Sequence, residues 1–200
     1  MIRPLSIESL RLVIVGGPNG CGKTTFARAY SEVEGLIYLG ADDVAARLSP
    51  DDPQAARVTA GRIFGRELSQ ALAAGSSLVV ESTLSGGSFA RYIEHARVKG
   101  YAVELVFVFL DSPELCVERI AERVAQGGHE VPEVDVRRRY IRSLSRFRTE
   151  YRALADDWLL IDNSGGSFVR VASGDENSET VYDEEVWQKF QKNGDAATNS

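Results

Sequence analysis

A glycine-rich run, Gly-Pro-Asn-Gly-Cys-Gly-Lys-Thr over residues 17–24, contains the residues whose types and spacing point to the most specific chemistry. It matches the pattern G-x-x-x-x-G-K-[ST] at every required position and directly follows the apolar stretch 11–15. Glycines allow successive backbone N–H groups to point inward around phosphate oxygens. A helix that begins near Gly22 also presents the positive end of its dipole to the same anion.

The two residues that close this run add a cation and a hydroxyl. Lys23 can reach the terminal phosphates of a nucleotide, and Thr24 has the hydroxyl that such a loop normally gives to Mg²⁺. We therefore expect ATP as the nucleotide and Thr24 as a metal ligand. The residues expected to bind ATP are Gly17, Pro18, Asn19, Gly20, Cys21, Gly22, Lys23, Thr24 and Thr25.

Transfer of a phosphoryl group to a hydroxyl also requires a base, and acidic residues follow two of the apolar runs. Asp42 comes just after the run 36–39, and we expect it to face the glycine-rich loop and accept the proton. Asp43 is the alternate base, and both aspartates are also suited to capping a helix that begins near Val44. Glu81 ends the run 77–80 and is expected to face Mg²⁺ or the acceptor, with Thr83 beside it, rather than being a simple charge at a strand end.

Arginines gather around a glycine-containing break at residues 127–132, a pattern typical of a hinged lid that closes over phosphates. Arg119 precedes the break and Arg138 follows it, and we expect these two to stabilise the transferring charge together with Lys23. A solvated charged face is the alternative for each arginine. His129, inside the break, is suited either to binding phosphate or to simple exposure. Asp111 precedes a helix start at Ser112 and is interpreted as structural.

The order of elements predicts the fold class. Apolar strand patterns at 11–15, 36–39, 77–80, 101–110 and 158–161 alternate with helical patterns, of which the longer ones cover 54–74, 89–99, 114–126 and 133–156. Such alternation predicts an α/β, three-layer P-loop NTPase sandwich with a mostly parallel five-stranded sheet and helices on both faces. A C-terminal hairpin, pairing 167–171 with 179–182, and a helix over 184–192 are expected to follow.

Length and composition set the outer limits of the prediction. The chain has 200 residues, 44% of them hydrophobic, which indicates one kinase domain over 1–192 with a lid around 126–142 and a frayed tail over 193–200. No apolar run is long enough to cross a bilayer and no secretory signal is present, so we expect a cytoplasmic protein without a membrane partner. The two cysteines, Cys21 in the glycine-rich run and Cys116 in a helical pattern, indicate neither a disulfide framework nor a zinc site. The net charge of −6 argues against a general nucleic-acid partner.

With these residues in view, the chain resembles the zeta toxin family of P-loop kinases over roughly residues 12–163. The resemblance is carried by the glycine-rich run, Ala-Asp-Asp at 41–43, Glu-Ser-Thr-Leu at 81–84, Arg119 and the stretch 127–140. It implies that ATP phosphorylates the 3′-hydroxyl of the sugar in UDP-N-acetylglucosamine, and that a small antitoxin protein blocks the nucleotide site. It further implies that Asp42 is the base, that Glu81 and Thr83 contact the acceptor, and that Arg119 stabilises phosphate.

Two positions depart from the pattern of that family. Ser85 stands where the better-known toxins have an arginine that contacts the acceptor, and His129 stands where they have a lid arginine. Arg138, Arg139 and Arg142 are all candidates to replace the lid charge. Other acceptors therefore stay open, namely an antibiotic, a nucleoside or a polynucleotide end, as does a regulatory ATP-binding protein that is not a kinase.

Overall fold

A single seven-stranded sheet forms the centre of the molecule, with the strand order β2-β3-β1-β4-β5-β6-β7 in the computed structural model, which describes residues 9–128 and 130–195. The first five strands are parallel, whereas β6 and β7 each run antiparallel to the strand before them. This confirms the predicted α/β fold with a mostly parallel sheet. The strands are β1 (Arg11–Gly16), β2 (Ile37–Leu39), β3 (Leu78–Ser82), β4 (Ala102–Phe109), β5 (Asp157–Asp162), β6 (Val169–Asp175) and β7 (Glu179–Val181).

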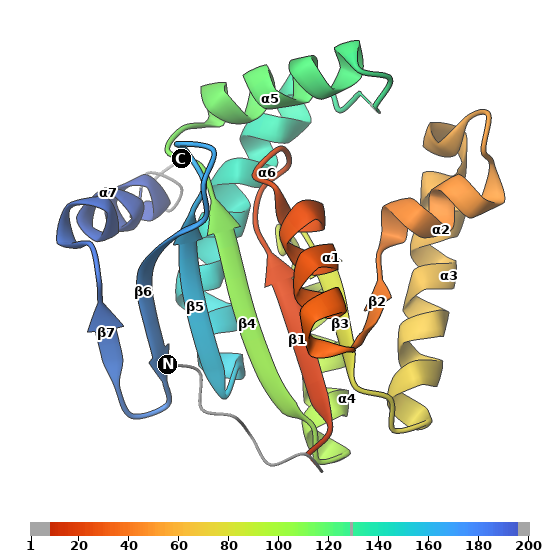
Figure 1. Cartoon of the computed structure of the whole chain (residues 1–200), viewed down its shortest axis with the longest axis horizontal. Coiled ribbons are helices and arrows are strands. Elements are labelled where there is room, and N and C mark those ends of the chain that lie inside the picture. Colours follow the sequence, from red (N-terminus) through yellow and green to blue (C-terminus); the bar gives the residue numbers. More distant parts are fainter. Residues whose placement is uncertain (1–8, 129, 196–200) are drawn as a thin grey trace.

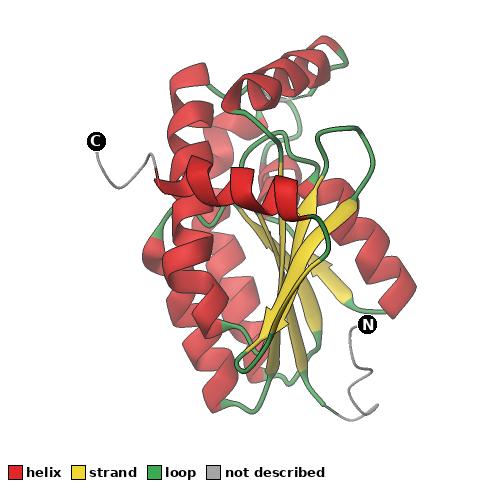
Figure 2. Ribbon diagram, turned by 90° about the vertical axis from the view of Figure 1, so that its left-hand side faces the viewer, coloured by secondary structure: helices red, strands yellow, loops and turns green. Residues whose placement is uncertain are grey.

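Helices cover both faces of this sheet, as Figures 1 and 2 show from two directions. In Figure 1, α1 lies in front of the strands, α4 and α6 lie behind them, and α5 lies above their carboxyl ends. The pair α2 and α3 lies beside the β2 edge. The helices are α1 (Lys23–Glu34), α2 (Ala41–Leu48), α3 (Pro53–Ala73), α4 (Ala90–Val98), α5 (Pro113–Ala125), α6 (Glu133–Arg146) and α7 (Glu184–Asp195).

The C-terminal hairpin extends the central sheet, which therefore has seven strands rather than the five expected. Strand β6 pairs with β5 along its length, from Asp157 opposite Asp175 to Asp162 opposite Val169. A strand at a sheet edge has a row of backbone N–H and C=O groups without partners, and β6 satisfies those of β5. The hairpin predicted from the sequence is present, and its pairing to β5 is the part that the sequence left unassigned.

The core lies on both faces of the sheet, between the strands and the helices that cover them. The inner strands are apolar almost throughout, and residues 12–15 of β1 are completely buried. An aromatic cluster packs α7 and Phe147, the residue that directly follows α6, against β4: the ring centroids of Phe107 and Phe147 are 4.5 Å apart, and those of Phe109 and Phe190 are 4.8 Å apart. Because buried aromatic pairs stabilise more than their area alone, this cluster holds α6 in a defined place behind the sheet.

Two helical segments differ from their predicted extents. The pattern 133–156 is divided, since α6 ends at Arg146 and is followed by a π-helical turn, Phe147–Tyr151, and a 3₁₀ turn, Arg152–Leu154. Helix α7 runs to Asp195, three residues into the segment expected to be frayed, and the rest of that segment lies outside the described residues. No helix in the described part of the chain has the length and apolar character needed to span a membrane.

Candidate active site

The glycine-rich loop joins β1 to α1 with a backbone that only glycine adopts readily. Gly17, Gly20 and Gly22 all have positive φ values, of 140°, 81° and 95°. A Cβ atom added to Gly17 would lie 1.9 Å from the carbonyl oxygen of Val108. The tight approach of neighbouring chain segments thus excludes side chains at these glycines, and at Gly20 and Gly22 the backbone itself borders the space at the start of α1.

Two residues of the loop shape it without lining that space. Cys21 is completely buried, and its carbonyl oxygen accepts a 2.9 Å hydrogen bond from Nδ2 of Asn163, just after β5. The carbonyl oxygen of Pro18 accepts a 2.6 Å hydrogen bond from Nζ of Lys23. The sequence-based expectation that Pro18 and Cys21 belong to the nucleotide-binding run therefore concerns their backbone.

Thr24 and Glu81 meet because β3 lies directly beside β1. The register places Val15 opposite Glu81, and Oγ1 of Thr24 donates a 2.8 Å hydrogen bond to Oε2 of Glu81. The hydroxyl of Tyr38 is buried nearby and has no hydrogen-bond partner among the residues that the structure describes. Burial and the carboxylate of Glu81 raise the pKa of this phenol, so Tyr38 stays neutral beside the site.

The two aspartates after β2 have different neighbours. Helix α2 begins at Ala41 rather than near Val44, and its N-cap is Gly40, so the prediction that the aspartates cap a later helix is wrong. Asp42 lines the cavity in front of the glycine-rich loop. Both carboxylate oxygens of Asp43 accept hydrogen bonds from Arg28 on α1, at 2.6 and 2.7 Å. Of the two carboxylates, only that of Asp42 therefore belongs to a residue that lines the cavity.

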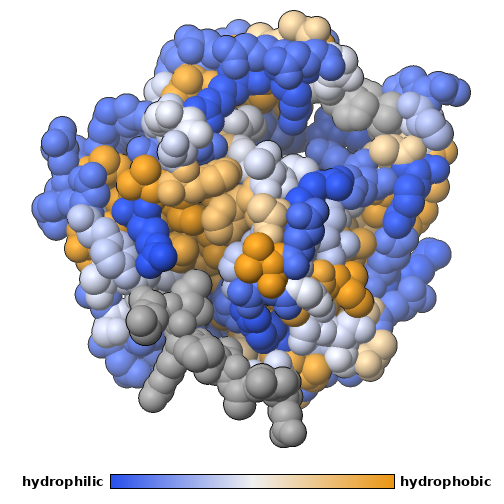
Figure 3. Space-filling model, viewed as in Figure 1, coloured by the Kyte–Doolittle hydropathy of each residue, from blue (hydrophilic) through white to orange (hydrophobic). Residues whose placement is uncertain are grey.

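Part of the glycine-rich loop, Thr24, Asp42 and Glu81 border one cavity of about 540 Å³ at the carboxyl ends of the parallel strands. Figure 3 shows the hollow between α5 at the top and α2 at the upper right. Five of its lining residues are basic and three are acidic, so the cavity suits an anionic ligand. The lining residues are Asn19, Gly20, Gly22, Lys23, Thr24, Thr25, Ala41, Asp42, Ala45, Arg57, Phe64, Glu81, Ser82, Thr83, Ser85, Arg119, Arg123, Glu130, Val131 and Arg139.

The arginines predicted from the sequence separate into two places. Arg119 lines the cavity, and its Nη2 donates hydrogen bonds to the carbonyl oxygens of Asn163 and Ser164, at 2.7 and 3.0 Å. Arg138 does not line it: this side chain borders a second groove and forms a 2.7 Å ion pair with Asp135. Successive helical residues point about 100° apart, so Arg139 takes the place in the cavity that the sequence assigned to Arg138.

Arg139 is embedded more deeply than a solvated surface arginine. Its Nη1 lies 3.4 Å from Oδ1 of Asn19 in the glycine-rich loop. Burial, and next the positive charge of Arg57, lower the pKa of Arg139. Two guanidinium groups close enough to repel each other in this way are stabilised when an anion lies between them.

Several cavity residues were not predicted from the sequence. Arg57 and Phe64 lie on α3, seven residues apart and thus on one helical face, and only that spacing could have drawn attention to them. Glu130 and Val131 lie in the break between α5 and α6, whereas Arg123, which also lines the cavity, is one of the arginines that the sequence places around that break. His129, the candidate inside that break, lies outside the described residues.

Comparison with known proteins assigns the family. A family model described as an AAA domain matches residues 12–146. The chain belongs to this AAA domain family. An uncharacterized protein of Haemophilus influenzae is 32% identical over 142 residues, which cover 69% of this AAA domain protein and 98% of that relative.

Solved structures share the fold at low sequence identity. The complex of AvrRxo1-ORF1 and -ORF2 with ATP has a TM-score of 0.73 and 19% identity, covering 91% of this AAA domain protein, which spans 63% of that chain. The PezAT toxin–antitoxin system of Streptococcus pneumoniae has a TM-score of 0.61 and 18% identity, covering 100% and 92% of the two chains. A gluconokinase from Sinorhizobium meliloti 1021 has a TM-score of 0.50 and 17% identity, covering 95% and 94%. The AAA domain therefore has a kinase-like P-loop fold.

Proposed function

We propose that this protein transfers the γ-phosphoryl group of ATP to a hydroxyl group of a small molecule. The observation that carries the proposal is that one cavity brings together the glycine-rich loop, Asp42, Glu81 and Arg139. Phosphoryl transfer needs a phosphate cradle, cations around the transferring group and a base for the hydroxyl. Residues from four separate segments of the chain supply these parts within the same space.

The residues fit ATP and Mg²⁺. Only glycine fits at position 22, because a Cβ there would lie 2.6 Å from Asn163 Nδ2, and a glycine backbone at the start of a helix suits phosphate binding. Thr24 Oγ1 and Glu81 Oε2 are neighbouring oxygen atoms of the kind that Mg²⁺ prefers as ligands. When bound, ATP supplies the phosphoryl group and Mg²⁺ neutralises charge on its phosphates.

The chain's own residues would then act in a defined order. Lys23 releases the Pro18 carbonyl and turns its ammonium group to the phosphates, while Arg139 and Arg119 stabilise the negative charge that develops. Asp42 accepts the proton of the acceptor hydroxyl while the oxygen of that hydroxyl forms the new bond to phosphorus. The bond from phosphorus to the bridging oxygen breaks, and ADP leaves.

We further propose a nucleotide sugar such as UDP-N-acetylglucosamine as the acceptor, as in zeta toxins. Support comes from the resemblance in sequence, and from Asp42, Glu81 and Thr83, which all line the cavity. Two structures with the same fold are complexes, AvrRxo1-ORF1 with -ORF2 and the PezAT toxin–antitoxin system. A small antitoxin protein that covers the nucleotide site is accordingly part of this proposal.

The substitution Asp42→Asn tests the function directly. We expect it to lower the rate of phosphoryl transfer by about 10²- to 10⁴-fold, the usual contribution of a general base, while the affinity for ATP stays unchanged. Transfer is measured with labelled ATP against nucleotide sugars, nucleosides and hydroxylated antibiotics, and ATP affinity is measured by calorimetry. The matched control is Asp43→Asn, because Asp43 pairs with Arg28 instead of lining the cavity. A near wild-type rate for Asp42→Asn contradicts the assignment of the base.

A further inference from the structure

A second groove, of about 700 Å³, adjoins the cavity and is lined on one side by arginines of α6. Arg138, Arg142 and Arg146 lie four residues apart, so they follow one another along about 12 Å of one helical face. The opposite wall is formed by Ser85 and Gly86, in the loop after β3. The proposed phosphoryl transfer from ATP to the acceptor hydroxyl, with Asp42 as base, uses none of these arginines.

The groove is positively charged and has unused binding capacity. Arg138 pairs with Asp135, which does not line the groove, and Arg146 pairs with Glu150, which does. Within residues 9–128 and 130–195, Arg142 has no hydrogen-bonding or ion-pair partner. The lining of the groove thus contains three guanidinium groups and one carboxylate. An exposed ion pair such as that of Arg138 contributes little stabilising free energy, so a ligand can replace it at little cost.

The walls of the groove are held in place by the fold. On α6, the face opposite the groove is buried, and Tyr140 donates a hydrogen bond of 2.8 Å to the carbonyl oxygen of Leu110. The phenol of Tyr151, at the end of the π-helical turn, donates a hydrogen bond to the carbonyl oxygen of Gly86 in the other wall. Gly87 is packed so closely that an added Cβ would lie 3.0 Å from Nη1 of Arg146. The spacing between loop and helix is therefore fixed before any ligand binds.

The groove and the cavity meet at Ser85, which lines both. The hydroxyl of Ser85 lies 2.9 Å from that of Thr83, which lines the cavity together with Glu81. A molecule whose hydroxyl lies at Asp42 can thus extend past Thr83 and Ser85 towards Arg142. Guanidinium forks match the geometry of phosphate oxygens and favour them over neutral groups.

From this arrangement we infer that the groove binds a phosphate or diphosphate group of the acceptor, remote from the hydroxyl that is phosphorylated. The inference rests on the proposed function, which places the reacting hydroxyl of the acceptor at Asp42. It narrows the acceptor to a small phosphate-bearing molecule. Binding energy from a remote phosphate positions the reacting hydroxyl, so an acceptor without its phosphate reacts poorly. The chain's net charge of −6 disfavours a long polyanion as the occupant.

Inorganic pyrophosphate is the probe for this groove. Binding is measured by calorimetry on the full chain, with the nucleotide site first saturated by a non-hydrolysable ATP analogue and Mg²⁺. We expect one pyrophosphate per chain, and binding about tenfold or more weaker in Arg142→Gln, the usual effect of removing a charged hydrogen-bonding group. Arg62→Gln, an exposed arginine of α3 that lines neither space, is the matched control and should bind as the wild type does.

Each outcome of this titration decides the matter. No binding, or equal binding by the wild type and Arg142→Gln, overturns the inference. A single-stranded oligonucleotide that binds through Arg142 more tightly than pyrophosphate also overturns it, since the occupant would then be a polynucleotide. If the ATP analogue fails to bind, the proposed function fails, yet an Arg142-dependent pyrophosphate site would still be measurable. Circular dichroism of the exposed variants checks that they fold.

Discussion

Neighbouring residues around the cavity separate into those that line it and those that pair with other side chains. Asp42 and Asp43 are neighbours of the same type, and only the pairing of Asp43 with Arg28 distinguishes their roles. The same holds for Arg138 and Arg139, which are adjacent on α6 and border two different spaces. At this scale, function depends on the direction of a side chain more than on its type.

The pair on α6 therefore makes a sharp test. We expect Arg139→Gln to lower kcat by about 10²-fold, as the loss of one preorganised charge donor typically does. Arg138→Gln should leave kcat within about twofold and change only the KM of the acceptor, because Arg138 lies in the neighbouring groove. Steady-state kinetics with a confirmed acceptor separates the two parameters. A large loss of kcat in Arg138→Gln would return the catalytic role to that residue.

At the scale of elements, the loop after β5 braces the glycine-rich loop. Asn163 is 6% exposed. Its Nδ2 donates a hydrogen bond to the carbonyl oxygen of Cys21, and its backbone carbonyl oxygen accepts one from Arg119. One residue thus joins β5, the glycine-rich loop and α5 at the point where a nucleotide would lie. The loop keeps its shape because three elements converge on it.

Removing this brace should affect both stability and binding. Asn163→Ala leaves the buried Cys21 carbonyl without its partner, which costs about 1–3 kcal/mol of unfolding free energy. We also expect weaker ATP binding, since the loop would no longer be held in its binding shape. Urea denaturation and calorimetry measure the two effects. Asn177→Ala, in the exposed turn between β6 and β7, is the control and should change neither.

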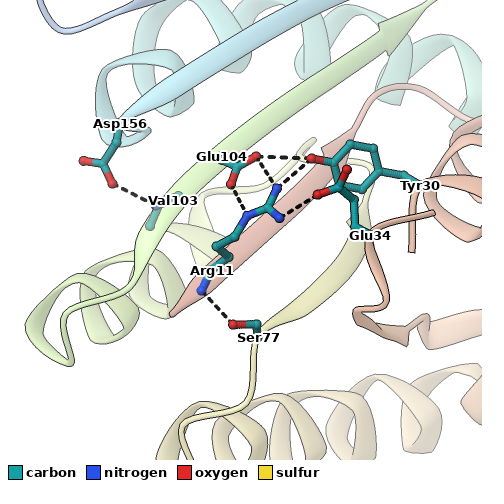
Figure 4. A network of polar contacts seen from close by, with 7 residues as sticks. All are labelled: Arg11, Tyr30, Glu34, Ser77, Val103, Glu104 and Asp156. Atoms are coloured by element: carbon teal, nitrogen blue, oxygen red, sulfur yellow. Dashed lines mark hydrogen bonds and ion pairs between the residues drawn. The ribbon is translucent and has the colours of Figure 1, made fainter. Parts of the chain in front are cut away.

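Across the whole molecule, the site and the stabilising ion-pair network lie at opposite ends of the sheet. Figure 4 shows the network, in which Arg11 of β1 contacts Glu104 of β4 at 2.7 Å, together with Tyr30 and Glu34 of α1. Glu104 is 5% exposed, and it raises the pKa of Arg11 more than any other group does. The network fastens α1 to the amino ends of two central strands, while the carboxyl ends carry the cavity.

We expect Glu104→Ala to lower the unfolding free energy by about 1–3 kcal/mol, because Arg11 loses the carboxylate that its Nε and Nη2 both contact, while Glu34 still pairs with it. ATP affinity below the unfolding transition should stay within about twofold, since the network is remote from the glycine-rich loop. Thermal unfolding with and without nucleotide measures both quantities. A selective loss of ATP binding in a stable variant would contradict this separation of roles.

The same network predicts how stability depends on alkaline pH. Burial and then the charge of Glu104 raise the pKa of Tyr30 from 10.0 to about 12 in the folded chain. A raised pKa means that the folded state holds the phenolic proton more tightly, so this contribution is complete below pH 10 and is lost as the pH rises towards 12. Unfolding free energy measured across this window should fall less steeply in Tyr30→Phe than in the wild type. Parallel curves for the two proteins would contradict the prediction.

The sequence by itself determined the glycine-rich loop, the alternation of strands and helices, and the acidic residues at strand ends. These features depend on local spacing: glycines that permit positive φ, apolar periodicity, and a Ser-Pro start for α5, where Ser112 accepts the Leu115 N–H as predicted. Local patterns of this kind can be predicted from the sequence because each one depends on interactions between residues only a few positions apart.

Only the tertiary structure decided which of these residues meet. The position of β3 beside β1 brings Glu81 to Thr24, and the rotation of α6 brings Arg139 into the cavity and leaves Arg138 outside it. Arg57 and Asn163 join the site from distant segments with no local signal in the sequence. Strand order and helix rotation are set by packing between segments far apart in the chain, so no short stretch of sequence contains them.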